Sequence, residues 1–375
     1  MKLLIQPEDG VLSIVEAINH AKSRVEIAIF RFDRGEIEKA LANAVSRGVF
    51  VHALIAYTNR GGERELRKLE MRLLAAGVTV ARTSDDLARY HGKYMIVDRR
   101  ELHILAFNFT HLDIDHSRSF GFITRTPRFV AEAVKLFEAD ASRQPYYATL
   151  PALVVSPLNA RKQLAAFIQG ARNELLIYDP EVSDQSMIRL LEDRAQAGVQ
   201  VKLIGRLRRK VERIEQHTLS KLRLHTRCMI RDNAVAFLGS QSLREMELGA
   251  RREVGVIFKN AKLVARMAKT FHRDWEEAER PTAQAGGADA VSATPDPASA
   301  TKVAKKVAKA IAKDLPPIAP VVEVVVKEVV GDGADVELDH NLVQDNVKDA
   351  VKEAVRDAVL DAVEDVVLQN GHARK

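Results

Sequence analysis

Apolar residues recur along the first 280 residues with the spacings of strands and helices in alternation. Two apolar runs typical of buried strands, 25–30 and 174–178, are each followed by a segment that is apolar at every third or fourth position. Such a spacing places the apolar side chains on one face of a helix. A second apolar run follows each helix, at 49–55 and at 199–204. Strands and helices that alternate in this way predict an α/β fold with a largely parallel sheet.

These elements are two copies of one repeat. The segment 21–30, AKSRVEIAIF, matches ARNELLIYDP, which begins 150 residues later, and 46–55 matches its own counterpart at the same offset. A fixed offset over two separate matches indicates an internal duplication. The first copy has an additional predicted helix and strand at 62–82. We therefore predict a first half over residues 1–150 and a second half over residues 151–280.

The composition changes after Arg280. Residues 281–300 are rich in small residues and proline, which is typical of a flexible linker. Between positions 346 and 367, valine recurs at every fourth residue, and side chains four apart share one face of a helix. We therefore assign 281–375 to a flexible linker and an amphipathic helical tail. Two interpretations of the tail stay open: peripheral contact with a membrane or a partner protein, and packing on itself or on the globular part.

Charge narrows the class of ligand. The chain has a formal charge of +6, but residues 281–375 hold 11 Lys or Arg against 16 Asp or Glu, which leaves about +11 for the residues before them. A basic globular part favours anionic ligands such as phosphodiesters, nucleic acid or acidic lipid.

Cysteine content and hydropathy bear on the compartment. Cys228 is the single cysteine, so no intramolecular disulfide is possible, and we expect a buried small hydrophobic residue rather than a thiol nucleophile. The N-terminus lacks the apolar core of a signal peptide, and no apolar run is long enough to span a membrane. We therefore expect a cytoplasmic protein that is at most peripheral at a membrane.

A second pair of matching segments carries the candidate chemistry. Residues 91–98 read HGKYMIVD and residues 225–232 read HTRCMIRD, so each has a histidine, then a cation, then an aspartate at the same spacing. Because alternate residues of a strand share a face, the histidine and the cation point the same way and the aspartate points to the opposite face. Each half therefore offers one imidazole beside one cation, and the aspartate is better suited to a supporting role.

This duplicated pattern resembles the signature of the phospholipase D superfamily, His-x-Lys-x(4)-Asp-x(6)-Gly-Ser-x-Asn, over about residues 1–280. The signature residues kept in the first copy are His91, Lys93, Asp98 and Asn108. Those kept in the second copy are His225, Asp232, Gly239 and Ser240. The departures are Leu105 and Ala106 in place of Gly-Ser, Arg227 in place of lysine, and Ser242 in place of asparagine. A glutamate that the family usually carries farther on is matched by Glu253, whereas the first half has Ser119 there.

The resemblance implies both a fold and a mechanism. The fold would be phospholipase D-like and α/β, with two repeated α-β-α sandwich halves related by pseudo-two-fold symmetry and one active site built from both. One histidine would form a phosphohistidine and the other would protonate the leaving group, with no metal and no other cofactor. We assign His91 as the nucleophile and His225 as the acid and base, by the usual order in the family. Glu253 would favour the reverse assignment if its carboxylate oriented His225.

The other site residues have expected roles of their own. Two cations, Lys93 and Arg227, would bind the phosphoryl oxygens. Asn108 and Ser240 would add further hydrogen bonds. The acids expected in supporting positions are Asp98, Asp232 and Glu253.

The function that these residues predict is that of a phospholipase D-type phosphodiesterase, which hydrolyses phospholipids or transfers phosphatidyl groups. A phosphodiester is the expected substrate, with phospholipid favoured over nucleic acid. A monomer suffices for the active site because one chain contains both halves. Two alternatives stay open: a nuclease of the same superfamily, and a catalytically impaired anion-binding protein that retains the phosphate pocket.

Two further polar segments have weaker interpretations. The segment 111–116, HLDIDH, contains two histidines and two aspartates, but we interpret it as a polar loop rather than a metal site. The basic run 206–210, RLRRK, is either a solvated surface or a grip for a polyanion near the site. It lacks the interleaved aromatic residues that stack on bases, so it does not predict sequence-specific reading of nucleic acid.

Overall fold

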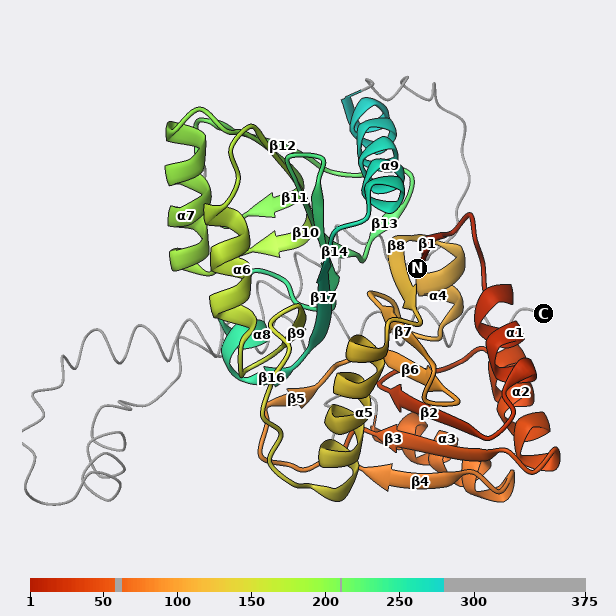
Figure 1. Ribbon diagram of the computed structural model, residues 1–375. Coiled ribbons are helices and arrows are strands. Elements are labelled where there is room, and N and C mark those ends of the chain that lie inside the picture. The colour runs from red at the N-terminus through yellow and green to blue at the C-terminus, as the bar shows by residue number, and fades with distance from the viewer. Residues whose placement is uncertain (58–62, 210, 280–375) are drawn as a thin grey trace, which may run out of the picture. The chain divides into compact units, whose positions relative to one another are not determined.

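The computed structural model describes residues 1–57, 63–209 and 211–279 (Figure 1). The elements of the first half are, in chain order, β1 (Lys2–Gln6), α1 (Leu12–His20), β2 (Arg24–Ile29), α2 (Gly35–Ser46), β3 (Phe50–Ile55), α3 (Glu63–Ala75), β4 (Thr79–Arg82), β5 (Arg89–Tyr90), β6 (Tyr94–Val97), β7 (Glu101–Leu105), α4 (His111–Asp115), β8 (Ser117–Thr124) and α5 (Pro127–Ser142). Those of the second half are β9 (Leu153–Val155), α6 (Ala160–Gln169), β10 (Glu174–Val182), α7 (Gln185–Gln196), β11 (Gln200–Leu207), β12 (Ile214–His217), β13 (Arg223–Leu224), β14 (Arg227–Arg231), β15 (Val235–Gly239), α8 (Glu245–Gly249), β16 (Arg251–Arg252), β17 (Val254–Phe258) and α9 (Ala261–Glu279).

Each half contains one main sheet, and the two sheets have equivalent strand orders. The first runs β1-β8-β7-β6-β2-β3-β4, and the second, read from its far end, runs β9-β17-β15-β14-β10-β11-β12. The strands correspond one to one, so the duplication predicted from the sequence is a duplication of structure. Helix α3 lies between β3 and β4 and has no described counterpart between β11 and β12, where the sequences of the two halves diverge.

Both sheets are mixed, so the expectation of a largely parallel sheet is wrong. Strands β2, β3 and β4 are parallel, as are β10, β11 and β12, but the pairings on the other side of β2 and of β10 are antiparallel. Two tight turns account for one antiparallel pairing in each sheet, that of β6 with β7 and that of β14 with β15. Asp98 and Arg99 join β6 to β7 with φ of 52° and 51°, and Asp232 and Asn233 join β14 to β15 with φ of 50° and 47°. Two successive positive φ values make a type I′ hairpin, whose strands must be antiparallel.

Helices cover both faces of each sheet. All residues from Val25 to Ile29 in β2 are buried, as are those from Leu175 to Tyr178 in β10. Successive residues of a strand point to opposite faces, so an unbroken buried run requires a layer on each side. Helix α5 contacts β3, β4, β6 and β7, while α1 contacts α2; in the second half, α9 contacts β12, β14 and β15, while α6 contacts α7. Each half is therefore an α-β-α sandwich.

Two short parallel strand pairs join the halves. Strand β5 pairs with β16, and β13 pairs with the first two residues of β8. The two pairings are related by the repeat, because every residue of one has its counterpart in the other 134 positions away. Strand β5 leads directly into His91, and β13 leads directly into His225. The backbone of each signature histidine is therefore held where the two halves meet. We call this region, formed by the β5–β16 and β13–β8 pairings, the seam.

The structure bears on two further expectations, about membrane-spanning helices and about Cys228. No helix in the ranges that the structure describes is long and apolar enough to cross a membrane. Cys228 is buried on β14, and burial raises the pKa of its thiol, as expected of a small hydrophobic residue. The linker and amphipathic helix predicted for 281–375 lie outside the described residues.

Candidate active site

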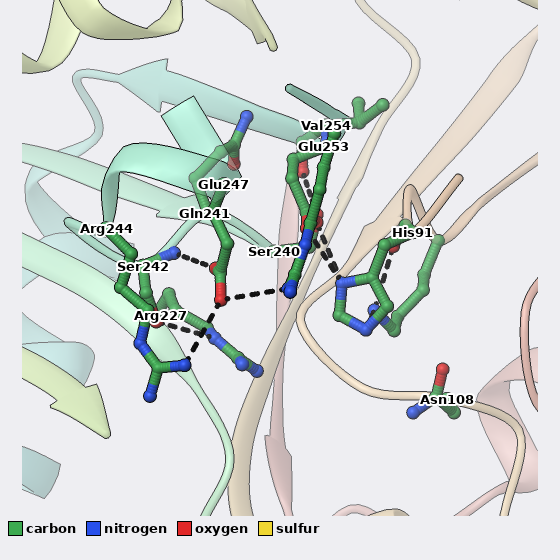
Figure 2. Close-up of polar contacts among 12 residues, drawn as sticks. His91, Asn108, Arg227, Ser240, Gln241, Ser242, Arg244, Glu247, Glu253 and Val254 are labelled. Carbon is green, nitrogen blue, oxygen red and sulfur yellow. Dashed lines mark hydrogen bonds and ion pairs between the residues drawn. The ribbon is translucent and has the colours of Figure 1, made fainter. Parts of the chain in front are cut away.

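The imidazole of His91 is paired with a carboxylate from the other half. The backbone N–H of His91 donates to the carbonyl of Arg252 (2.8 Å), which brings the histidine next to Glu253. Nδ1 of His91 lies 2.9 Å from Oε2 and 3.0 Å from Oε1 of Glu253, and Figure 2 shows the carboxylate facing the ring. Glu253 therefore orients His91 rather than His225, and the argument for reversing the roles of the two histidines no longer holds.

Lys93 lies on the other side of the same ring. Its Nζ is 2.9 Å from Nε2 of His91 and donates to the His91 carbonyl at 2.8 Å. Burial, reinforced by Lys93 and Arg227, lowers the pKa of His91 well below its usual range, so the imidazole is neutral at neutral pH. The carboxylate holds the single ring proton on Nδ1, which leaves a lone pair on Nε2. A histidine in this state can act as a nucleophile through Nε2.

His225 has different surroundings from His91. Its backbone N–H donates to the carbonyl of Arg118 (3.2 Å), the counterpart of Arg252. Ser119 therefore occupies the place that Glu253 has beside His91, and its hydroxyl has no hydrogen-bond partner among the described residues. The replacement of a glutamate by Ser119 leaves His225 without the carboxylate that this position supplies in the other half.

A carboxylate from another position lies near His225 instead. Oδ2 of Asp113 is 3.5 Å from Nδ1 of His225, and Oδ1 accepts from Arg223 at 2.8 Å. Burial alone would raise the pKa of Asp113, but His225 and Arg223 lower it below its usual range. Asp113 is therefore ionised and can stabilise a protonated His225. Burial lowers the pKa of His225 well below its usual range, an effect that Asp113 opposes.

Asn108 is bonded to the same carboxylate. Its backbone N–H and its side-chain amide both donate to Asp113 Oδ2 at 2.7 Å. Asn108 was expected to bind a phosphoryl oxygen, but one of its amide protons is used to hold Asp113. Its counterpart Ser242 repeats the contact, since the Ser242 N–H donates to Glu247 at 2.6 Å. Asp113 and Glu247 are 134 residues apart, the offset of the two histidines, and the sequence analysis missed both. That shared offset was the available signal.

Arg227 connects the two histidines electrostatically. Its Nε donates to Ser242 Oγ at 3.2 Å (Figure 2). Its Nη1 donates to the His225 carbonyl at 2.7 Å, so the guanidinium is fixed at two points. Positive charge on Arg227 contributes to lowering the pKa of both His91 and His225. A single guanidinium thus acts on an imidazole from each half.

Ser240 does not direct its hydroxyl to the histidines. The hydroxyl accepts from the Val254 N–H at 3.1 Å and lies 3.4 Å from the Val254 carbonyl. Val254 follows Glu253, so Ser240 supports the strand that carries this carboxylate. These contacts hold the hydroxyl against β17, and a hydrogen bond from Ser240 to a phosphoryl oxygen stays a prediction.

Asp98 and Asp232 lie at the hairpin turns rather than beside the histidines. Asp98 accepts backbone N–H bonds from residues 22–24 at 2.7–3.1 Å, and Asp232 accepts the equivalent bonds from residues 172–174. Each aspartate ties a signature hairpin to the start of the neighbouring parallel strand, β2 or β10. The structure therefore gives them a part in holding the fold.

The two remaining polar segments have structural partners. The interpretation of 111–116 as a polar loop is wrong, because His111–Asp115 form helix α4, whose first turn is capped by the Thr110 hydroxyl. Asp115 pairs with Arg34. Within the described ranges, no group of three or more His, Cys, Asp or Glu is arranged to hold a metal ion. In the basic run, Arg206, Arg208 and Arg209 are exposed, and Arg209 pairs with Glu192 on α7. Lys210 lies outside the described residues.

Comparisons with known proteins agree with this architecture. A family model described as cardiolipin synthase, PLD-like domain, matches residues 14–141 and 164–275, one stretch in each half. No curated protein sequence matches the chain.

Several solved structures have a related fold. Polyphosphate kinase from Porphyromonas gingivalis is 18% identical over 73% of this chain, with a TM-score of 0.61, and this chain spans 50% of that one. Phosphatidylserine synthase from Haemophilus influenzae Rd KW20 is 10% identical over 74% of this chain and 86% of its own, with a TM-score of 0.53. Nuc, a phospholipase D family member from Salmonella typhimurium, is 21% identical over 40% of this chain and 99% of its own, with a TM-score of 0.34. At these identities, the first two show a shared fold.

Proposed function

Because this chain belongs to the phospholipase D superfamily, whose members act on phosphodiesters, we propose that it is a phosphodiesterase that forms a phosphohistidine at Nε2 of His91. The observation that carries the proposal is the His91–Glu253 pair, with Nδ1 2.9 Å from the carboxylate. A neutral imidazole with its proton held on Nδ1 presents a lone pair at Nε2. Glu253 stabilises the positive charge that the ring acquires when Nε2 bonds to phosphorus.

The other residues provide the remaining parts of the reaction. Lys93 and Arg227 neutralise charge on the phosphoryl oxygens, which gives the site electrostatic stabilisation without a metal ion. As the bond from Nε2 to phosphorus forms, the bond from phosphorus to the leaving oxygen breaks, and His225 donates a proton to that oxygen. Neutral His225 then removes a proton from water or an alcohol, which attacks phosphorus and releases His91.

Protonation of His225 is coupled to substrate binding in this scheme. Burial lowers its pKa in the free enzyme, so an additional negative charge is needed to favour the imidazolium. A phosphodiester held by Lys93 and Arg227 brings that charge, and Asp113 adds its own at 3.5 Å. The general acid is therefore generated when the substrate is bound.

Among phosphodiesters we place phospholipids ahead of nucleic acid. The family model that matches both halves is named for cardiolipin synthase, a description that points to phosphatidyl groups. Hydrolysis and phosphatidyl transfer differ only in whether water or an alcohol attacks the phosphohistidine.

The test is turnover of a p-nitrophenyl phosphodiester in excess EDTA by the wild type, His91→Ala and His225→Ala. We expect metal-independent turnover by the wild type and none by His91→Ala, because the nucleophile is lost. p-Nitrophenolate leaves without help from an acid, so His225→Ala should release one equivalent per site in a burst and then stall with a phosphorylated enzyme. A burst in His91→Ala would contradict the assignment of the nucleophile. Tight binding of inorganic phosphate by a wild type that turns over no diester would favour the anion-binding alternative.

A further inference from the structure

A buried carboxylate, Asp140, lies behind the His91–Glu253 pair. It accepts a hydrogen bond from the Tyr90 hydroxyl and another, at 3.1 Å, from Nη2 of Arg252. Tyr90 is the residue before His91, and Arg252 is the residue before Glu253. All three residues are at most 9% exposed. One carboxylate on α5 is therefore bonded to the neighbour of each member of the pair.

The backbone makes this contact relevant to the imidazole. Tyr90 and Arg252 are registered partners in the β5–β16 pairing, and the His91 N–H donates to the Arg252 carbonyl at 2.8 Å. Successive side chains of a strand point in opposite directions, so Tyr90 and Arg252 lead away from the reacting atoms while His91 and Glu253 face them. Asp140 can act on the pair only through these two strands.

The other half of the molecule offers an internal comparison. Asp274 on α9, the counterpart of Asp140, holds Arg118 through bonds of 2.6 and 3.1 Å. Arg118 is in turn the counterpart of Arg252. Each half thus has an Arg–Asp bridge across the seam. Because both halves have it, a role in holding the fold together is enough to explain this bridge.

The halves differ in the residue before the histidine, which is a tyrosine only in the first half. Leu224 occupies the position before His225, and the hydroxyl that reaches Asp274 comes from Tyr178 on β10, at 2.6 Å. In the half of His91, the residue before the histidine is a tyrosine bonded to the aspartate of the bridge, and the histidine has a glutamate partner. The half of His225 has neither feature. The His225 side has Ser119 in place of the glutamate and lacks the tyrosine at the equivalent position.

We propose that Tyr90 and Asp140 are positioning residues that set the alignment of His91 with Glu253. Together with Arg252 they hold the two strands in the register that places Nδ1 of His91 on the carboxylate. This keeps the ring proton on Nδ1 and directs Nε2 towards the substrate. The effect on turnover rests on the proposed function, whereas the effect on the hydrogen bond itself does not.

Tyr90→Phe tests the proposal with the smallest change. The substitution keeps the aromatic ring and removes the hydroxyl that reaches Asp140. Tyr146→Phe is the matched control, because Tyr146 is buried and donates to Glu132 at 2.8 Å, on the same helix, yet it precedes neither histidine. We expect kcat for the p-nitrophenyl diester to fall by about tenfold in Tyr90→Phe with KM unchanged, since misalignment acts on the chemical step. Tyr146→Phe should stay near the wild-type value.

A second readout does not depend on turnover. In protein labelled with ¹⁵N-histidine, the Nδ1–H resonance of His91 is identified by its loss in His91→Ala. This resonance should shift in Tyr90→Phe and stay in place in Tyr146→Phe. An unchanged resonance in Tyr90→Phe, or equal shifts in both phenylalanine variants, would overturn the proposal. If the wild type turns over no phosphodiester, the proposed function fails on that result, and the resonance alone decides whether Tyr90 positions His91.

Discussion

At the scale of single residues, the two cations of the site differ in how firmly they hold their charge. Lys93 is 1% exposed, and burial lowers its pKa to about 7 although Glu253 acts in the opposite direction. The other cation is an arginine, a residue type whose guanidinium does not lose its proton in proteins. A phosphoryl oxygen bound between them therefore meets one permanent positive charge and one that titrates near neutrality.

This difference predicts the pH dependence of activity. A lowered pKa means that the Lys93 ammonium is present below about pH 7 and is lost as the pH rises through that value. We expect kcat/KM for a phosphodiester, which reports the free enzyme, to fall above about pH 7. Lys93→Arg keeps its charge and should move this alkaline limb to higher pH, at a lower maximum because a planar fork replaces a point charge. Identical alkaline limbs in the two proteins would show that another group is responsible.

At the scale of secondary-structure elements, each copy of the signature forms a hairpin whose aspartate caps the N–H groups at the start of a neighbouring strand. In each half, the aspartate of the signature begins a type I′ turn and accepts the N–H groups at the start of a neighbouring strand. Partial burial alone would raise the pKa of Asp98, but backbone N–H bonds from Arg24, Ser23 and Lys22 lower it. Asp232 has a lowered pKa for the equivalent reason. The spacing between the histidine and the aspartate thus fixes where the hairpin turns and which strand it meets.

Removal of this cap should cost stability in a pH-dependent way. Asp98→Ala leaves several N–H groups without their acceptor, so we expect the free energy of unfolding to fall by roughly 1–3 kcal/mol. A depressed pKa in the folded state stabilises the protein above the unfolded value of about 3.9, and this contribution is lost as the pH falls through the folded value. The difference between wild type and variant in urea denaturation should therefore shrink in acid. Asp85→Ala, in an exposed loop, is the control, and an equal loss there would contradict the capping role.

At the scale of the whole molecule, each half completes the surroundings of the other half's histidine. Glu253 from the second half partners His91, and Asp113 from the first half lies near His225. Behind these contacts, Arg118 and Asp274 form a bridge across the seam, with Arg118 3% and Asp274 4% exposed. Each histidine thus has its carboxylate neighbour only when the halves are docked.

The seam is expected to be sensitive to loss of a buried charge. Arg118→Met removes the guanidinium that pairs with the buried Asp274 and leaves it the Tyr178 hydroxyl and the more distant Arg273, so the free energy of unfolding should fall by about 3–5 kcal/mol. Arg72→Met removes an exposed ion pair with Glu38, and its cost should stay below about 1 kcal/mol. Chemical denaturation of both variants measures the difference. Equal costs would show that the seam does not depend on this bridge.

The features that are local or periodic follow from the amino-acid sequence alone. The duplication follows from offsets along the chain, and alternation along the chain predicted that His91 and Lys93 lie together, although strand β6 begins only at Tyr94. The signature aspartates lie apart from the histidines, at the turns that follow β6 and β14. These features depend on residues that are close together along the chain, so the order of apolar and polar residues is enough to predict them.

Which groups meet across the seam depends on how the two halves dock. Glu253 and His91 are 162 residues apart, and no periodicity in the chain indicates that they are partners. Ser240 and Asn108 matched the signature, yet their side chains are bonded to a strand and to Asp113. The directions of the strands likewise depended on tight turns that apolar runs do not report. The physical reason is that periodicity encodes which face a side chain occupies, whereas docking of the two halves determines what that face contacts.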